Sequence, residues 1–213
     1  MNKIAVLVSG SGSNLQALIN ASKSGYFSGK VVLVISNIED AYGLTRAKNE
    51  MIDAVYISHK NKSREEFEKE VVEVIDKYNI DLVALAGFMR VLSPFFVSHY
   101  KGKLMNIHPA LLPAFPGINV QEKQFDYGVK IAGCTVHFVD EGTDTGPIIV
   151  QAAVPVFSDD NGDKVKERIL KEEHKIYPLA IKLFFENRLS IVGRRVIIEN
   201  EEKNNISLVN PLP

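Results

Sequence analysis

The sequence is short of the features that mark secreted and membrane proteins. It has a single cysteine, Cys134, which excludes an intrachain disulfide and indicates a reducing compartment. No apolar run approaches the roughly 20 residues that cross a bilayer. The apolar start, residues 3–9, is too short for a signal segment and is predicted to be a strand. We therefore expect a cytoplasmic protein with no membrane partner.

The sequence also lacks a surplus of basic residues. Its 25 Lys and Arg stand against 26 Asp and Glu, giving a formal net charge of −1. Nucleic-acid-binding proteins usually carry a basic surplus, so we expect no nucleic-acid partner. Hydrophobic residues make up 46% of the 213 positions, which is enough for the core of one domain.

Continuous apolar runs characterise the first half of the chain. They cover residues 3–9, 30–36, 53–57, 81–88 and 103–107. Unbroken hydrophobicity is typical of strands that are covered on both faces in a parallel sheet. Helical periodicity lies between the runs, over 13–23 and over 63–78 with Ser63 as the predicted N-cap. This alternation predicts an α/β fold, an open, mostly parallel twisted sheet flanked by helices.

The second half has a different pattern. Residues 129–139 and 147–157 predict an antiparallel hairpin, followed by a helix over 163–189 with a kink near Pro178 and a strand over 192–200. There is no repeat and no linker. We expect one domain, 1–200, with an N-terminal half over 1–107 and a C-terminal half over 108–200. The polar tail, 201–213, is expected to be frayed.

The first loop, VSGSGSNLQAL at 8–18, has the form of a strand, a glycine turn and a helix start. Its glycines let the backbone approach a ligand, and the helix start can hold an anion. The dinucleotide fingerprint is absent because Leu15 stands in place of the third glycine, and there is no P-loop lysine. Two interpretations stay open: an ordinary turn, or a phosphate-monoester site at Gly12, Ser13 and Asn14.

Asn106 and His108 lie two residues apart at the end of an apolar run. In a strand they share one face, where an amide donor and an imidazole suit a carbonyl oxygen that becomes an oxyanion. The alternative is a loop cap beside a surface histidine. Three prolines follow at 109, 113 and 116 and stiffen the loop, where the Leu112–Pro113 bond is a candidate for the cis form.

Two acidic residues, Asp144 and Glu173, stand where a carboxylate is expected to interact with another polar group. Asp144 lies in the loop 140–146, and a carboxylate beside His108 favours the protonated ring that a general acid needs. A solvated hairpin loop is the alternative. Glu173 falls in the apolar stripe of the long helix, where a buried carboxylate needs a partner. That partner is a ligand hydroxyl or amine, or an internal salt bridge.

The other histidines carry weaker signals. His59 and His99 are predicted to lie at the surface, His137 to be packed in a strand, and His174 to lie on a charged helix face. No pair has metal-ligand spacing, and one cysteine cannot build a thiolate site. We expect no metal.

Six segments together resemble the formyltransferases that use 10-formyltetrahydrofolate. They are residues 8–18, 63–67, 85–93, 106–117, 137–149 and 172–178. NIHPALLP with a correctly spaced Asp144 is specific to this superfamily, and the glycine loop with EHKIYP points to the branch that acts on 5'-phosphoribosylglycinamide. Ala110 and Asn119 depart from the pattern, which has serine and histidine there.

The resemblance implies a Rossmann-like formyltransferase fold and a role in purine biosynthesis. The formyl group of 10-formyltetrahydrofolate, a cosubstrate, passes to the amine of 5'-phosphoribosylglycinamide without a metal. The implied partners are small molecules, and the chain is expected to be a monomer or homodimer. The implied catalytic residues are Asn106, His108 and Asp144, and the implied acceptor-binding residues are Gly12, Ser13, Asn14 and Glu173. The implied folate-binding residues are Arg64, Met89, Arg90, Val91, Leu92, Asn106 and Asp140.

Three alternatives differ in what they need. A methionyl-tRNA formyltransferase needs a further RNA-contacting domain and a basic surplus. A formyltetrahydrofolate hydrolase uses water as acceptor and is expected to carry an additional N-terminal domain. A non-catalytic phosphate- or nucleotide-binding module explains the first loop but gives no reason for Asn106, His108 and Asp144 to coincide.

Overall fold

The computed structural model describes residues 1–203 and 208–211. The predicted tail, 201–213, therefore lies partly outside the described residues. In the described part, no helix combines the length and apolar character that a membrane crossing requires.

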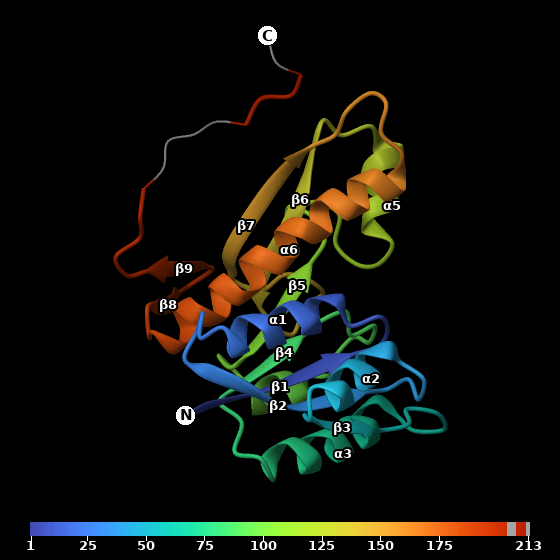
Figure 1. Ribbon diagram of the computed structural model, residues 1–213, viewed down its shortest axis with the longest axis vertical. Coiled ribbons are helices and arrows are strands. Elements are labelled where there is room, and N and C mark those ends of the chain that lie inside the picture. Colours follow the sequence, from blue (N-terminus) through green and yellow to red (C-terminus); the bar gives the residue numbers. More distant parts are fainter. Residues whose placement is uncertain (204–207, 212–213) are drawn as a thin grey trace.

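The described chain forms one nine-stranded sheet in the order β3-β2-β1-β4-β5-β6-β7-β9-β8 (Figure 1). The strands are β1 (Asn2–Val8), β2 (Gly29–Ser36), β3 (Asp53–Tyr56), β4 (Leu82–Leu85), β5 (Leu104–His108), β6 (Ile131–Phe138), β7 (Ile148–Pro155), β8 (Leu189–Val192) and β9 (Arg195–Ile198). The helices are α1 (Ser13–Lys23), α2 (Tyr42–Asn49), α3 (Arg64–Asp76), α4 (Pro94–His99), α5 (Val120–Tyr127) and α6 (Gly162–Phe185). The predicted mostly parallel α/β sheet with an antiparallel C-terminal portion is confirmed.

The strand order reverses between β1 and β4. The chain moves outward from β1 through β2 to β3, then returns to β4 and β5 on the other side of β1, and all five strands are parallel. In open α/β sheets, the crevice at such a reversal, beyond the carboxyl ends of the strands, is the usual ligand site. The loops that follow β1, β4 and β5 meet at this edge.

Beyond β5 the sheet becomes antiparallel. The strand β6 runs against β5 and places His137 opposite Asn106 and Thr135 opposite His108. The strand β7 runs against β6, and the β8–β9 hairpin joins β7 through the pairing of Ile148 with Arg195. This register brings the polar ends of β5 and β6 together.

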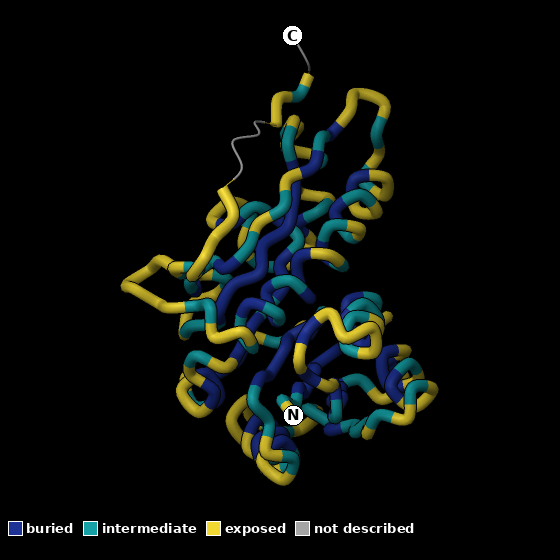
Figure 2. The backbone as a smooth tube through the Cα atoms, turned by 60° about the vertical axis from the view of Figure 1, so that its left-hand side comes forward, coloured by how far each residue is buried: buried dark blue, intermediate teal, exposed yellow. Residues whose placement is uncertain are grey.

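Apolar side chains cover both faces of the sheet. One cluster includes Leu15 of α1, Leu44 of α2 and Ile169 of α6, and the other includes Phe67 of α3 and Phe96 of α4. The central strands are accordingly buried along their length (Figure 2). A rigid, doubly covered sheet therefore carries the loops at its carboxyl edge.

Some local structure differs from the predictions. The helices α2, α4 and α5 are short, and α5 buries only Val120 and Gln124, so their periodicity is weak. The strand predicted over 192–200 is a hairpin, because Gly193 adopts a φ of 61° and turns the chain. The helix predicted to end at 189 ends at Phe185, since Leu189 begins β8. Ser63 caps α3 as predicted.

Candidate active site

A cleft of about 340 Å³ lies at the carboxyl edge of the sheet. Four segments line it, and they come from residues 85–92, 106–109, 117–121 and 137–144. Three of these segments lie at or just after the ends of β4, β5 and β6, and the fourth includes the start of α5. The sheet topology therefore brings together parts of the chain that are far apart in sequence.

Asn106 and His108 both face this cleft from the last residues of β5. Their shared side follows from the alternation of a strand, as predicted. Asn106 is half-buried, whereas His108 is 3% exposed. The cleft therefore holds an amide and an imidazole next to each other, and the imidazole is shielded from bulk water.

Both ring nitrogens of His108 face oxygen atoms. Nε2 lies 2.8 Å from the carbonyl oxygen of Phe115, and Nδ1 lies 3.4 Å from Oδ2 of Asp144. The same Oδ2 accepts a hydrogen bond of 2.8 Å from the backbone N–H of Gly117. Two acceptors suit a doubly protonated ring, because each N–H then has a partner. The His108 and Asp144 side chains are only 4% and 13% exposed, so solvent screens their attraction weakly.

His137 also lines the cleft, although the sequence favours a packed role for it over a catalytic one. Its Nδ1 lies 2.8 Å from the Phe138 carbonyl oxygen, and its Nε2 lies 3.3 Å from Nδ2 of Asn106. Burial is the main cause that lowers the pKa of His137. The signal that locates it is the β5–β6 register, which sets it directly across from Asn106.

The loop after β5 is fixed by polar contacts with β6 and β7. The Thr135 hydroxyl donates to the Ala110 carbonyl at 2.7 Å and accepts from the Leu112 N–H at 3.1 Å. Gln151 donates to the Leu112 carbonyl and to the Thr135 hydroxyl, both at 2.9 Å. The Leu112–Pro113 bond is cis. Of the two departures from the family pattern, Ala110 is buried and Asn119 lines the cleft.

The segment Met89–Leu92 forms one wall of the cleft. The Met89 N–H donates to the Ser9 hydroxyl at 2.8 Å, and the Arg90 guanidinium lies 5.0 Å above the Phe67 ring. Met89 and Val91 are 69% and 54% exposed. Apolar side chains are thus presented at the cleft by a segment whose backbone is anchored.

Asp140 and Arg64 differ in their relation to the cleft. Asp140 lines it, and its Oδ1 accepts from the Thr145 hydroxyl at 2.6 Å and the Gly142 N–H at 3.1 Å, which shapes the 140–145 loop. Arg64 is exposed at the first turn of α3 and is not among the residues that line the cleft.

The glycine loop turns tightly into α1. Gly12 has a φ of 68°, and a Cβ there would lie 2.7 Å from the Gly43 Cα, so no other residue fits without a shift. The Gly43 N–H donates to the Gly10 carbonyl at 3.0 Å, and Arg46 Nε donates to the Ser11 carbonyl at 2.8 Å. The first turn of α1, from Ser13, leaves free N–H groups that suit an anion.

Asn14 and Glu173 form a buried pair between α1 and α6. Nδ2 of Asn14 donates to Oε2 of Glu173 at 2.6 Å, and they are 9% and 5% exposed. Burial raises the pKa of Glu173, while the bond from Asn14 opposes that shift. The Asn14 Oδ1 atom is buried and has no hydrogen-bond partner in the described chain. The pair therefore retains an unused acceptor, and Glu173 meets an amide rather than the cation of a salt bridge.

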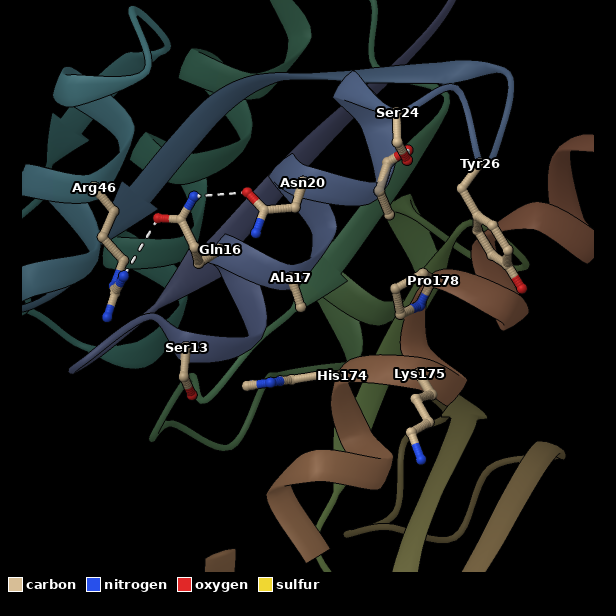
Figure 3. Close-up of a pocket in the computed structure, with 11 residues that line it drawn as sticks. Ser13, Gln16, Ala17, Asn20, Ser24, Tyr26, Arg46, His174, Lys175 and Pro178 are labelled. Carbon is tan, nitrogen blue, oxygen red and sulfur yellow. Dashed lines mark hydrogen bonds between the residues drawn. The ribbon is translucent and has the colours of Figure 1, made fainter.

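A second cavity of about 720 Å³ lies between α1 and α6. Figure 3 shows Ser13 and His174 at one end of it, with Arg46 bonded to Gln16 nearby. His174 is half-buried rather than exposed on a charged face, and its Nε2 has no partner in the described residues. The positive side chains of Arg46 and Lys175 line the same cavity, so the surroundings of the glycine loop favour an anion.

No set of three or more His, Cys, Asp or Glu side chains within residues 1–203 and 208–211 is arranged to hold a metal ion. The polar side chains that line the cleft include Asn106, His108, His137 and Asp144.

Comparisons with known proteins agree with this geometry. Residues 2–181 match the family model described as "Formyl transferase". The phosphoribosylglycinamide formyltransferase of Escherichia coli (strain K12) is 48% identical over 189 residues, which cover 88% of this chain and 89% of that protein.

Solved structures show the same likeness. Glycinamide ribonucleotide transformylase 1 from Symbiobacterium toebii superposes with a TM-score of 0.92 at 49% identity, covering 94% of this chain and 95% of that one. A formyltetrahydrofolate deformylase from Pseudomonas syringae has a TM-score of 0.87 at 24% identity, and 66% of its chain is covered. The latter likeness shows a shared fold alone.

Proposed function

Because the chain belongs to the formyl transferase family, we propose that it transfers the formyl group of 10-formyltetrahydrofolate to the amine of 5'-phosphoribosylglycinamide. The products are formylglycinamide ribonucleotide and tetrahydrofolate, in de novo purine biosynthesis. The observation that supports this most is that Asn106, His108 and Asp144 line one cleft within the matched stretch.

The folate cosubstrate fits the wall formed by Met89–Leu92. Backbone groups of this segment can read the polar edge of a pterin, and the exposed Met89 and Val91 side chains offer apolar cover to an aromatic ring. Asp140 and its loop close the other side. Arg64, exposed on α3, is proposed to meet the glutamate tail of the folate outside the cleft.

The formyl-accepting substrate, 5'-phosphoribosylglycinamide, is proposed to bind between α1 and α6. Gly12, Ser13 and Asn14 hold its phosphate at the helix start. Glu173 and the unused Oδ1 of Asn14 are proposed to accept hydrogen bonds from an amine or hydroxyl of this substrate. A ligand donor at this point completes a buried pair that is otherwise only partly satisfied.

The chemistry is proposed to rest on Asn106 and His108. Nδ2 of Asn106 and protonated His108 donate to the formyl oxygen as negative charge develops there, and Asp144 stabilises the charged ring. His108 Nε2 contacts the Phe115 carbonyl, so it must exchange that acceptor for the formyl oxygen. A bond forms between the formyl carbon and the acceptor amine, and the bond to N10 breaks. The amine loses one proton and N10 gains one.

No metal is assigned to this reaction, since two donors meet the charge on the formyl oxygen. We propose the domain assignment of one unit over 1–200, which the Asn14–Glu173 bond between its two halves supports. A cytoplasmic location and a monomer or homodimer complete the proposal. Sedimentation measurements with and without both substrates test the oligomeric state.

An absorbance assay tests the function. The chain is mixed with 10-formyltetrahydrofolate, with and without 5'-phosphoribosylglycinamide, and the same mixtures without the chain serve as the control. We expect tetrahydrofolate to form only when the amine is present. Deformylation without the amine indicates a hydrolase, and no reaction in either case indicates a binding module.

A further inference from the structure

His137 is a buried imidazole that the proposed chemistry leaves without a task. It is 2% exposed and lies on β6 directly opposite Asn106. Three oxygen or nitrogen atoms surround its ring: the Phe138 carbonyl oxygen at 2.8 Å, Asn106 Nδ2 at 3.3 Å and Asp144 Oδ1 at 3.8 Å. These contacts determine where its hydrogen lies.

The contact with Phe138 selects one tautomer. A carbonyl oxygen only accepts hydrogen bonds, so Nδ1 of His137 carries the hydrogen that it receives. In the neutral ring, Nε2 then has a lone pair and acts as an acceptor. Burial is the main cause that lowers the pKa of His137, and His108 lowers it further. The bond to the Phe138 carbonyl, Asp144 and Asp140 raise the pKa, and the net direction is downward. The neutral ring is also consistent with the 3.8 Å to Asp144, which is longer than a hydrogen bond.

Because Nε2 of His137 is a hydrogen-bond acceptor, it favours the orientation of the Asn106 amide in which Nδ2, and not Oδ1, faces His137. The amide has two donors on Nδ2 and an acceptor at Oδ1. One Nδ2 hydrogen points to His137, and the second remains for an acceptor in the cleft that Asn106 lines. If the amide were reversed, Oδ1 of Asn106 would face the lone pair on Nε2 of His137, and the two atoms would repel each other.

We propose that His137 is a positioning residue that holds the Asn106 amide with Nδ2, not Oδ1, available to the substrate oxygen. This inference rests on the proposed formyl transfer. A reversed amide would direct a carbonyl oxygen at the developing negative charge and raise the barrier. His137 thus acts through Asn106 and does not touch the reacting atoms.

A double-mutant cycle tests this coupling. His137→Leu is expected to lower kcat by about 10-fold or more, since loss of an oxyanion donor costs roughly 10²–10³-fold, with both KM values nearly unchanged. In the Asn106→Ala background, the same substitution is expected to change kcat little. A merely structural role predicts equal losses in both backgrounds and overturns the proposal. Val136→Ala, at a buried neighbouring position of β6, is the control and should give additive effects with Asn106→Ala.

A second measurement needs neither activity nor a variant that folds. The ¹⁵N NMR shifts of the His137 ring in the unmodified chain are expected to show a protonated Nδ1 and an unprotonated Nε2. A protonated Nε2 overturns the proposal. If the assay detects no amine-dependent transfer while the ring has the expected tautomer, the proposed function fails and the hydrogen-bond assignment stands.

Discussion

At the scale of single residues, the two histidines that line the cleft differ in their hydrogen-bond partners. His108 lies between two oxygens, one from a carboxylate and one from a backbone carbonyl. His137, one strand away, has a carbonyl on one nitrogen and an amide donor on the other. The two histidines on adjacent strands therefore meet different groups, two oxygens at His108 and an oxygen with an amide nitrogen at His137, and burial lowers the pKa of His137.

His108→Ala is expected to lose most turnover. Removal of a general acid typically costs about 10²–10⁴-fold in rate, whereas the other residues that line the cleft are unchanged. Steady-state kinetics give kcat, and calorimetry gives the dissociation constants, which should change little. His99→Ala removes an exposed imidazole at the end of α4 that pairs with Asp76 and should keep full activity. An unaltered kcat for His108→Ala eliminates its catalytic role.

Glu173→Gln is expected to change how stability depends on pH. Burial raises the pKa of Glu173 above its ordinary 4.5, so the folded chain keeps this proton to a higher pH than the unfolded chain. The protonated Glu173 therefore contributes a stability that is fully present below the ordinary pKa. That contribution is lost as pH rises through the raised pKa. Glutamine cannot ionise and can still accept from Asn14.

The measurement is the free energy of unfolding in denaturant, from about pH 4 to about pH 8. The stability of Glu173→Gln relative to the unmodified chain should rise across this range. Glu172→Gln, on the same helix but paired with Lys175 at the surface, is the control and should lack the trend. A constant difference for Glu173→Gln contradicts the prediction.

At the scale of elements, α3 supports the wall of the cleft formed by Met89–Leu92. The Glu68 carboxylate of α3 is 1% exposed and accepts from both the N–H and the hydroxyl of Ser93, with Oε1 at 2.8 Å from the nitrogen. Ser93 follows Leu92 directly and caps α4. The ring of Phe67 stacks on Phe88, with centroids 6.4 Å apart. The helix α3 thus fixes the end of the wall without reaching the cleft.

Ser93→Ala is expected to raise the KM for the folate more than the KM for the acceptor. The change removes a cap, worth about 0.5–2 kcal/mol, and leaves one oxygen of Glu68 unsatisfied beside the wall formed by Met89–Leu92. Asn161→Ala removes the corresponding cap of α6, which accepts from the Lys164 N–H at 2.9 Å. It should lower Tm similarly without altering either KM. Equal increases in both KM values for Ser93→Ala argue against this selective effect.

Elements also show how far the sequence predicts the structure. The parallel strands follow from unbroken apolar runs, and the shared side of Asn106 and His108 follows from strand alternation. The positions of His137 and Asn14 do not, since they depend on β5–β6 register and on a bond that joins residues 159 positions apart. The helix α5 buries two side chains, so its local pattern is too weak to predict. Short-range periodicity determines the elements, and long-range pairing completes the site.

At the scale of the whole molecule, α6 connects the two halves of the fold. Tyr177 is fully buried, and its hydroxyl lies 3.0 Å from the Leu85 carbonyl oxygen and 3.1 Å from that of Met105. These carbonyls belong to β4 and β5, whose carboxyl ends border the cleft. The C-terminal helix is thereby joined to the centre of the parallel sheet.

Tyr177→Phe is expected to destabilise the fold by about 1–3 kcal/mol, because it leaves two buried carbonyls without this donor. Denaturant unfolding gives the loss, which should appear as one cooperative transition with an unchanged m value. Tyr127→Phe, at a side chain that is 81% exposed, should have almost no effect. A stability equal to that of the unmodified chain shows that the hydroxyl contributes nothing.

The bond between Asn14 and Glu173 has a consequence for the order in which the molecule is made. It joins groups 159 positions apart, and both belong to the proposed acceptor site. During synthesis, the glycine loop emerges before α6, so the Asn14 amide gains its Glu173 partner only after that helix has been made. A nascent chain that has left the ribosome only as far as β7 therefore carries Met89–Leu92 and the Asn106–His108 pair but only part of the proposed acceptor site. The proposed site for the amine is therefore complete only in a chain whose synthesis has passed Glu173.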